Sequence, residues 1–329
     1  MYSDEGALLR VEPPSTGTPS GEGPGCYDPE TNLIWHTLFA DPWAQEGSTW
    51  VASYDADSLA HGPRWAPPRN ECESVLLGPD GLLYVGYQQR TFNTVGVEDE
   101  LWRPLDVFQQ DGTHVASLRP WQWGYQMTDW LDWGKTIIFT DEKRLIRILD
   151  VESEKLTAFG DMWGTAPEGY ALRSEVADAS YEDNPGSQVT WGVQASHKRS
   201  KIYVLATVFK QGVTQSNANA ETIISVWDFM GNHCANWLIN ATGMIAYNLR
   251  MTKDEGYLWV NDYLNSPSAF YRVDAGSGGG VDAPLFYNEP SNERRVGAFA
   301  TDRIPYGNIP LKMQGSLVGQ DNRFEKAEL

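Results

Sequence analysis

A short pattern recurs along the chain about every fifty residues, and this repeat constrains the fold more than any other feature of the sequence. Each copy has turn residues followed by a strand of aliphatic and aromatic residues, as in residues 78–85 and 254–260. Asp-Gly and similar pairs make tight hairpin turns because they tolerate a positive φ angle. The copies align on Ile34, Leu83, Ile138, Ile202 and Leu258. The repeat therefore predicts a series of β-hairpins.

A second element follows each copy: a strand that ends in an apolar residue and an aspartate, directly before another turn. These aspartates are Asp55, Asp150, Asp228 and Asp274, and Gln109 takes the same place in the second unit. An aspartate at such a position can accept hydrogen bonds from backbone N–H groups of its own turn. Its recurrence therefore needs no catalytic explanation.

A candidate innermost strand precedes each aligned strand. These candidates are residues 74–77, 125–128, 188–191, 245–247 and 295–299. Each unit thus holds about four short antiparallel strands, and no segment shows convincing helical periodicity over ten or more residues. Four-stranded units that repeat in this way are typical of a β-propeller, an all-β fold whose sheets pack face to face around a ring.

Counting the units predicts six sheets, or blades. The sixth begins near Arg294 and includes residues 309–313, but it is short of strands. We expect residues 7–11 to complete it, so that the N-terminal strand closes the ring. Seven sheets is the alternative, because residues 160–187 have room for further strands, although their polar composition favours an inserted loop.

The two ends of the chain lie outside the predicted ring, which spans residues 23–319. Residues 1–22 supply the N-terminal strand and a linker rich in Pro, Gly and Ser, and residues 320–329 form a polar tail. The first ten residues do not resemble a signal peptide, and no stretch is apolar enough for a membrane span. We therefore expect a soluble protein made in the cytoplasm.

The charge balance excludes one class of partner. The chain has 25 Lys and Arg against 44 Asp and Glu, which gives a formal charge of −19. Because phosphate binding needs clustered basic residues, nucleic acid is not expected as the main partner. Cations or basic protein surfaces are favoured instead.

The cysteines do not form a disulfide framework or a zinc motif, because only Cys26, Cys72 and Cys234 are present.

Three segments resemble blades of a known group of propellers. Residues 73–86 are similar to the blade start of the SMP-30/gluconolactonase, strictosidine-synthase-like and NHL group, and residues 138–150 and 254–260 resemble other blades of that group. The resemblance covers about two thirds of the chain and implies a six-bladed ring. Blade patterns recur in propellers of unrelated function, so the resemblance does not supply an activity.

The lactonase members of that group hold a divalent cation in the central channel, with Glu, Asn and Asp from the starts of inner strands. The resemblance places Glu73 and Asn248 at equivalent positions, and Asp129 lies one residue from another. Hard cations such as calcium take oxygen ligands of this kind, together with water. Such an ion would polarise a carbonyl and activate water. The alternative is a solvated channel that holds no cofactor.

Tryptophan is abundant, with 14 residues, and its densest run lies within residues 121–133. Tryptophan rings beside Asp and Gln can stack on the apolar faces of sugars. The candidates for such a glycan-binding surface are Trp121, Trp123, Trp130 and Trp133. Packing between neighbouring sheets is the alternative, and we favour it because large aromatic side chains fill the wedge between twisted sheets.

These features favour a non-catalytic propeller that binds a protein partner or forms part of a larger assembly, such as a phage virion or tail. The scaffold is complete, whereas no complete catalytic set is present. The histidines have no metal-binding spacing, and His114 and His233 follow hairpin turns, which indicates structural roles. A metal-dependent lactonase of the SMP-30 type and a carbohydrate-binding propeller are the alternatives.

Overall fold

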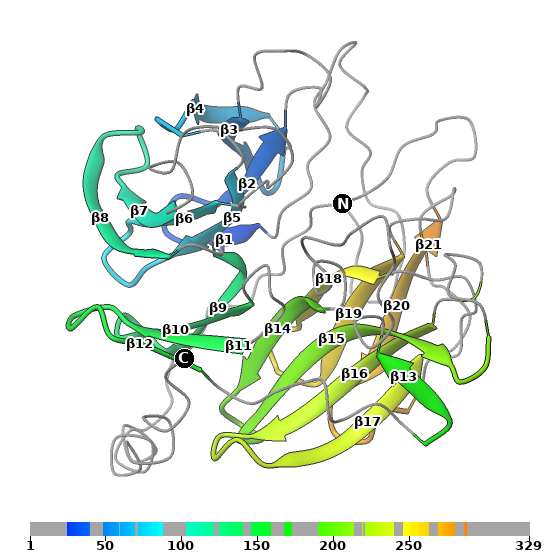
Figure 1. Ribbon diagram of the computed structural model, residues 1–329. Coiled ribbons are helices and arrows are strands. Elements are labelled where there is room, and N and C mark those ends of the chain that lie inside the picture. Colours follow the sequence, from blue (N-terminus) through cyan, green and yellow to red (C-terminus); the bar gives the residue numbers. More distant parts are fainter. Residues whose placement is uncertain are drawn as a thin grey trace.

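The described part of the chain consists of short β-strands joined by turns. The computed structural model describes residues 25–39, 49–58, 60–69, 72–87, 103–121, 125–140, 146–158, 168–172, 190–213, 219, 221–239, 246–262, 269–279 and 286–287. These residues form five antiparallel sheets that follow one another in sequence order (Figure 1). The prediction of an all-β propeller with four-stranded units is confirmed.

The first three sheets each contain four strands in sequence order. Sheet 1 contains β1 (Cys26–Asp28), β2 (Leu33–Phe39), β3 (Thr49–Asp55) and β4 (His61–Trp65). Sheet 2 contains β5 (Cys72–Leu77), β6 (Leu83–Tyr87), β7 (Arg103–Phe108) and β8 (His114–Trp121). Sheet 3 contains β9 (Gln126–Asp132), β10 (Thr136–Thr140), β11 (Ile146–Asp150) and β12 (Leu156–Ala158).

The last two sheets follow the same plan, with one addition. Sheet 4 contains β14 (Thr190–Ser196), β15 (Lys201–Lys210), β16 (Glu221–Asp228) and β17 (His233–Ile239), and β13 (Tyr170–Leu172) pairs with the end of β15. Sheet 5 contains β18 (Ala246–Met251), β19 (Tyr257–Asp262), β20 (Ala269–Asp274) and β21 (Phe286–Tyr287). In every sheet the first strand of the main unit is the innermost, because β1, β5, β9, β14 and β18 contact one another in series.

The first hairpin of every sheet turns through one residue with a positive φ. The φ angles at these positions lie between 52° and 74°, in the left-handed region that costs a residue with a side chain about 1–2 kcal/mol. The five positions are Asn32, Gly81, Gly134, Ser200 and Glu255. The repeat seen in the sequence thus corresponds to a repeated backbone turn, and the aligned aliphatic residues lie in the strand that follows it.

The aspartates at the ends of the third strands hold the second hairpin. Asp274 Oδ1 accepts hydrogen bonds from the backbone N–H groups of Gly276 at 2.9 Å and Ser277 at 2.8 Å. Asp55 and Asp150 each accept both the N–H and the hydroxyl of the serine three residues further on. The predicted structural role is confirmed for Asp55, Asp150, Asp228 and Asp274.

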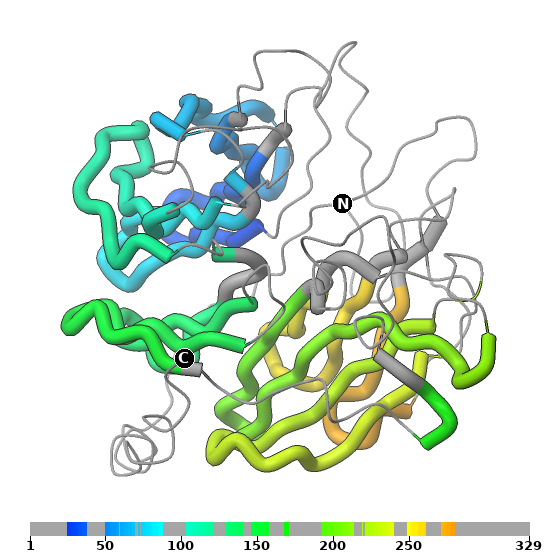
Figure 2. Tube along the Cα trace, viewed as in Figure 1, coloured from blue at the N-terminus to red at the C-terminus, as the bar shows by residue number. Residues whose placement is uncertain are grey.

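A layer of buried apolar side chains separates each pair of neighbouring sheets. Figure 2 shows the sheets following one another in chain order, from blue to orange. Trp35 of β2 and Tyr87 of β6 are fully buried between sheets 1 and 2. Trp130 of β9 is fully buried in the layer that joins sheets 2 and 3. Each fully buried side chain of this size contributes about 1.5–3 kcal/mol, so the inter-sheet layers form the core.

The number of sheets differs from the prediction. The described residues contain five sheets rather than six, and residues 7–11, 295–299 and 309–313, which we expected in the sixth, lie outside them. Residues 160–187 were expected to form an inserted loop. They include β13, whose Tyr170 pairs with Lys210, so this part of the prediction was wrong. The strand extends sheet 4 because β15 is longer than the innermost strand beside it.

In the portion of the chain covered by the description, no helix has the length and apolar character that crossing a membrane requires.

Candidate functional site

The innermost strands are linked by side chains that cap backbone groups of the next sheet. Gln194 Oε1 of sheet 4 accepts the N–H of Met251 in sheet 5 at 3.2 Å. Asp129 Oδ2 of sheet 3 accepts the N–H of Ala195 in sheet 4 at 3.0 Å. Both capping side chains belong to a set, termed here the inner belt, that occupies the same place on each innermost strand. Its members are Cys26, Leu76, Asp129, Gln194 and Arg250.

The inner belt also explains the unusual position of Asp129, a carboxylate that is only 3% exposed. The apolar Leu76 precedes it in the belt and cannot cap the N–H of Trp130. Asp129 Oδ1 accepts that N–H instead, at 2.9 Å. Both carboxylate oxygens therefore bind backbone N–H groups, which supplies part of the hydrogen bonding that a buried carboxylate needs.

The first and last members of the belt lie near each other. Burial raises the pKa of the Cys26 thiol to about 12, and the guanidinium of Arg250 together with a hydrogen bond from the N–H of Leu77 opposes this rise. Cys26 belongs to sheet 1 and Arg250 to sheet 5, so the row of sheets curves until its two ends approach each other. At this pKa the thiol is protonated at neutral pH, which makes it a poor nucleophile.

The structure describes only some of the side chains of the metal site predicted from the family resemblance. Glu73 lies in β5 and Asn248 in β18, both innermost strands, but their side chains lie outside the described residues. Asp129 is the third candidate, and both of its oxygens carry the backbone hydrogen bonds given above. Within the described ranges, His, Cys, Asp and Glu do not form a group of three or more that could hold a metal ion.

The four tryptophans of the predicted glycan surface separate into different environments. Trp130 is fully buried, and its indole N–H donates to the carbonyl of Leu77 in sheet 2 at 2.7 Å. Trp133 is half-buried and packs edge-on against Trp130, with ring centroids 5.7 Å apart. Trp121 is half-buried beneath the guanidinium of Arg147. Trp123 lies outside the described residues.

Burial decides what these rings can do. A sugar must reach the face of a ring to stack on it, and the ring of Trp130 has no exposed surface. Its hydrogen bond and packing instead join sheets 2 and 3. Trp121 and Trp133 keep part of their surface exposed, so any ligand contact in the described part of this set depends on them.

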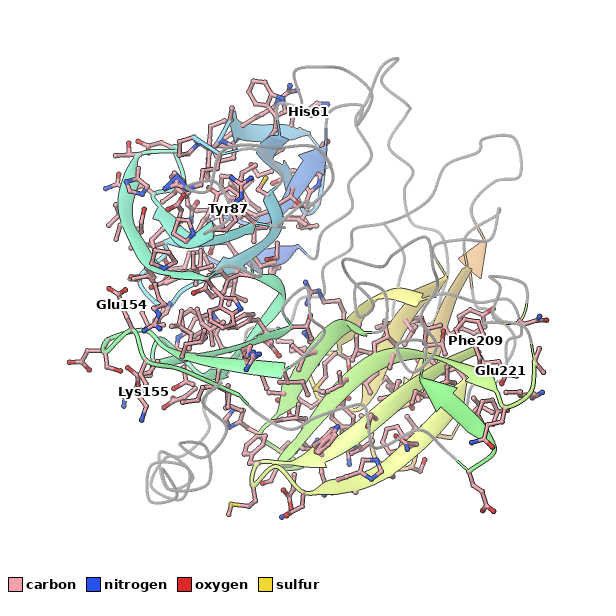
Figure 3. The ribbon with its side chains drawn as sticks, viewed as in Figure 1. His61, Tyr87, Glu154, Lys155, Phe209 and Glu221 are labelled. Carbon is pink, nitrogen blue, oxygen red and sulfur yellow. The ribbon has the colours of Figure 1, made fainter. Side chains whose placement is uncertain are left out.

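A polar cluster that the sequence did not reveal surrounds Asp106 of β7, a carboxylate with no exposed surface. Its Oδ1 accepts the hydroxyl of Ser117 at 2.6 Å, and its Oδ2 accepts the hydroxyl of Tyr87 at 3.0 Å. Arg69 Nε lies 3.8 Å from Oδ2, and His114 Nε2 lies 3.6 Å from Oδ1. Burial and the neighbouring Asp106 charge raise the pKa of Tyr87. Figure 3 shows Tyr87 inside sheet 2.

Ser117, His114 and Asp106 resemble the residue types of a hydrolase triad, but their geometry is different. In a triad the serine donates to the histidine, and the opposite ring nitrogen of the histidine faces the carboxylate. Here Ser117 donates directly to Asp106, and the single nitrogen His114 Nε2 faces both partners, 3.1 Å from Ser117 Oγ. The histidine therefore does not stand between the hydroxyl and the carboxylate, so the cluster does not activate Ser117 in that way.

The same histidine position recurs in other sheets, which indicates its role. His61, His114 and His233 each begin the fourth strand of their sheet, and each is paired in register with an aromatic residue of the third strand. His114 and His233 meet those rings edge-on, both at centroid distances of 5.3 Å. His233 Nε2 also contacts Asn236 Oδ1 at 3.2 Å, as His114 contacts Ser117. The expected structural role of the histidines after hairpin turns is thus supported by their contacts.

A signal for this arrangement is present in the sequence. An aromatic residue stands directly before the turn Asp or Gln, and a histidine follows five or six residues later. The pairs are Tyr54 and His61, Phe108 and His114, and Trp227 and His233. Aligning the third strands on their final residue, rather than only the first hairpins, would have revealed it.

The comparisons with known proteins show similarity of fold only. No protein-family model matches the chain, and no curated protein matches it. Among solved structures, a chain of a nidogen/laminin complex is similar, with a TM-score of 0.50 and 10% identity over 85% of both chains.

Two further structures are similar at lower scores. One is the hydrazine synthase of Kuenenia stuttgartiensis, with a TM-score of 0.45, 15% identity, and coverage of 85% of this chain and 70% of that one. The other is the β-propeller domain of Cps50 (Swd1) from Myceliophteria thermophila, with a TM-score of 0.47, 11% identity, and coverage of 82% and 71%. Identities this low carry no information about activity.

Proposed function

We propose that this chain is a non-catalytic β-propeller that binds a protein partner or forms part of a larger assembly. The main support is that the polar side chains most suggestive of chemistry already hold the scaffold together. Asp129 caps two backbone N–H groups, Asp106 accepts two hydroxyls, and His114 repeats the role of His233. These contacts explain the presence of these polar side chains by their contribution to the stability of the fold.

The setting of a phage virion or tail remains a proposal within this function, and so does the count of six sheets. A soluble, acidic propeller suits an assembly whose neighbours present basic surfaces, because the formal charge is −19. Membership of the SMP-30 group would add a calcium ion held by Glu73, Asn248 and Asp129. That ion is the less favoured proposal, because the described carboxylate among the three is already hydrogen-bonded to the backbone.

The test is reconstitution with a defined partner. Immobilised full-length chain is incubated with lysate, with heat-unfolded chain as the control, and proteins retained only by the folded chain are identified by mass spectrometry. Each candidate is then purified separately and mixed with the chain. We expect a complex of fixed stoichiometry in sedimentation velocity. A chain that remains a monomer with every candidate would contradict the proposal.

A parallel measurement addresses the enzymatic alternative. Elemental mass spectrometry of the purified chain reports bound calcium, and lactone hydrolysis is assayed with and without chelator. The non-catalytic proposal predicts no turnover above that of a Glu73→Gln variant. Calcium-dependent turnover that the Glu73→Gln and Asn248→Ala variants both abolish would establish the lactonase instead.

A further inference from the structure

Sheet 4 carries a lysine and a cysteine whose terminal atoms lie against each other. Lys201 is the first residue of β15, and Cys234 is the second residue of β17. Nζ of Lys201 donates a hydrogen bond to Sγ of Cys234 at 2.9 Å. β16 lies between these two strands, which Figure 1 shows side by side. The two side chains therefore meet across a strand to which neither belongs.

The register of the sheet explains how residues two strands apart come together. Lys201 is paired with Asp228 at the end of β16. In β17, Cys234 is the extra residue of a register shift, because the pairs on either side of it use Ala235 and His233. An extra residue of this kind locally changes the direction of a side chain. The shift thus accompanies the contact between the Cys234 sulfur and the end of the long lysine side chain.

Exposure distinguishes Cys234 from the two other cysteines. Cys234 is exposed, whereas Cys72 is buried and Cys26 is half-buried. Burial raises the pKa of Cys26 to about 12, so its thiol stays protonated at neutral pH. Reactive cysteines lie in accessible sites beside positive charge, and the ammonium of Lys201 supplies that charge at Cys234. Of the three thiols, that of Cys234 is the one an oxidant in solution reaches first.

Two further contacts hold the pair in place. The Cys234 thiol donates a weak hydrogen bond to the carbonyl oxygen of Asn232 at 3.5 Å. The carboxylate of Asp228 interacts electrostatically with Lys201. The S–H bond is therefore directed to one side of the sulfur atom, while the lysine nitrogen occupies another. This arrangement places a nitrogen nucleophile within reach of the sulfur before any reaction begins.

We propose that Cys234 and Lys201 form a covalent sulfur–nitrogen crosslink when the chain meets hydrogen peroxide. The Cys234 sulfur attacks one peroxide oxygen, the O–O bond breaks, and the thiol proton leaves with the other oxygen as water, which yields a sulfenic acid. The lysine ammonium loses one proton to solvent. Its nitrogen then attacks the sulfur, the S–O bond breaks, and the hydroxyl leaves as a second water with an N–H proton. The sulfur loses two electrons, and the peroxide gains them.

The crosslink makes one edge of the propeller sensitive to oxidation. It joins β17, the last strand of sheet 4 among the described strands, to β15 and closes a loop of residues 201–234. A strand at the edge of a sheet is the part that opens or pairs with another chain most readily. Oxidation would therefore fasten this edge in place. The inference is independent of the proposed function, because it requires no partner.

Mass spectrometry of the full-length chain tests the crosslink. The purified chain is treated with hydrogen peroxide, freed of excess oxidant and digested without reductant. We expect a chain about 2 Da lighter than the untreated one, and a peptide in which residues 201 and 234 are joined, both reversed by a thiol reductant. An unreacted Cys234, a sulfinic acid, a bond to another lysine or a disulfide between two chains would each overturn the proposal.

Lys201→Arg is the matched variant. It keeps a positive charge beside Cys234, but the guanidinium remains protonated and is a poor nucleophile. After the same treatment we expect its Cys234 to remain a sulfenic acid that dimedone labels, whereas the unsubstituted chain should escape labelling. Cys234→Ser should show no loss of mass, since the two other thiols are less accessible. Equal dimedone labelling of the unsubstituted chain and Lys201→Arg, with both folded by near-ultraviolet circular dichroism, would contradict the proposal.

Discussion

The carboxylate of Glu255, in the first turn of sheet 5, accepts a hydrogen bond from the hydroxyl of Ser196 in sheet 4 at 2.6 Å. The same oxygen accepts the backbone N–H of Lys198 at 3.0 Å. Glu255 keeps this contact although its φ of 57° lies in the left-handed region. Its side chain therefore joins two sheets at a position where glycine would suit the backbone better.

Glycine substitutions at two glutamates separate backbone strain from side-chain contact. Glu154 has a φ of 53° in the second turn of sheet 3, beside Lys155 at the edge of the molecule in Figure 3. Glu154→Gly should raise the free energy of unfolding by about 1 kcal/mol, because it relieves the left-handed backbone. Glu255→Gly should lower it by about 1–3 kcal/mol, because hydrogen bonds to a buried carboxylate are lost. Urea unfolding measures both. Equal effects at the two positions would show that the Glu255 contacts contribute little.

Removing the cap at Asp129 should be more costly than removing the cap at Gln194. Asp129→Ala removes the side-chain acceptor of two backbone N–H groups, whereas Gln194→Ala removes the acceptor of one, that of Met251. Each lost hydrogen bond in a buried site costs about 1–3 kcal/mol. We expect losses in the free energy of unfolding of about 2–5 and 1–3 kcal/mol, with both measured in the presence of chelator. A loss at Asp129 that appears only when calcium is present would instead indicate a metal ligand.

Substitutions at two neighbouring tryptophans distinguish core packing from a ligand surface. Trp130→Phe removes the hydrogen bond to Leu77 and leaves a cavity, so we expect a loss of about 2–4 kcal/mol in unfolding free energy. Trp133→Phe, on a half-buried ring, should cost about 1 kcal/mol or less. Thermal and urea unfolding of the two variants provide the measurement. A glycan array in which only Trp133→Phe loses binding would support the carbohydrate alternative.

The turn aspartates make stability depend on acidic pH. Hydrogen bonds from Ser277 lower the pKa of Asp274 below its ordinary value of 3.8. A carboxyl group whose pKa is lower in the folded state stabilises the fold above its unfolded pKa, and this contribution is lost as the pH falls through the folded value. We expect the urea concentration at the unfolding midpoint of the unsubstituted chain to decrease as the pH is lowered below about 4. Ser277→Ala should reduce that fall, and an unchanged pH profile would contradict the assignment.

Local features were predictable from the sequence because they depend on a few consecutive residues. The turn at Asp274 needs only the three residues that follow it, and the hairpin at Gly81 needs one residue with a positive φ. Such patterns recur in every unit, so the strands and the propeller class followed from them. The strand β13 was missed because Tyr170–Leu172 pairs only where β15 extends past its innermost neighbour, which no local pattern encodes.

The candidate site was harder to predict because its residues meet across strands. Asp106 contacts Arg69 and Tyr87, which lie on other segments of the chain, and it has no exposed surface. From residue type and position in the sequence alone, Asp129 is a candidate metal ligand. Its actual partners are backbone groups that only the neighbouring innermost strand brings within reach.

The inner belt has a consequence for how such a ring can be rearranged. Each sheet is matched to the one after it, since Gln194 Oε1 accepts the N–H of Met251 and Asp129 makes up for the apolar Leu76. Two sheets could not be exchanged without leaving one N–H uncapped and one capping side chain unused. Moving the chain ends to another loop preserves every match. Circular permutation should therefore be tolerated where the shuffling of blades is not.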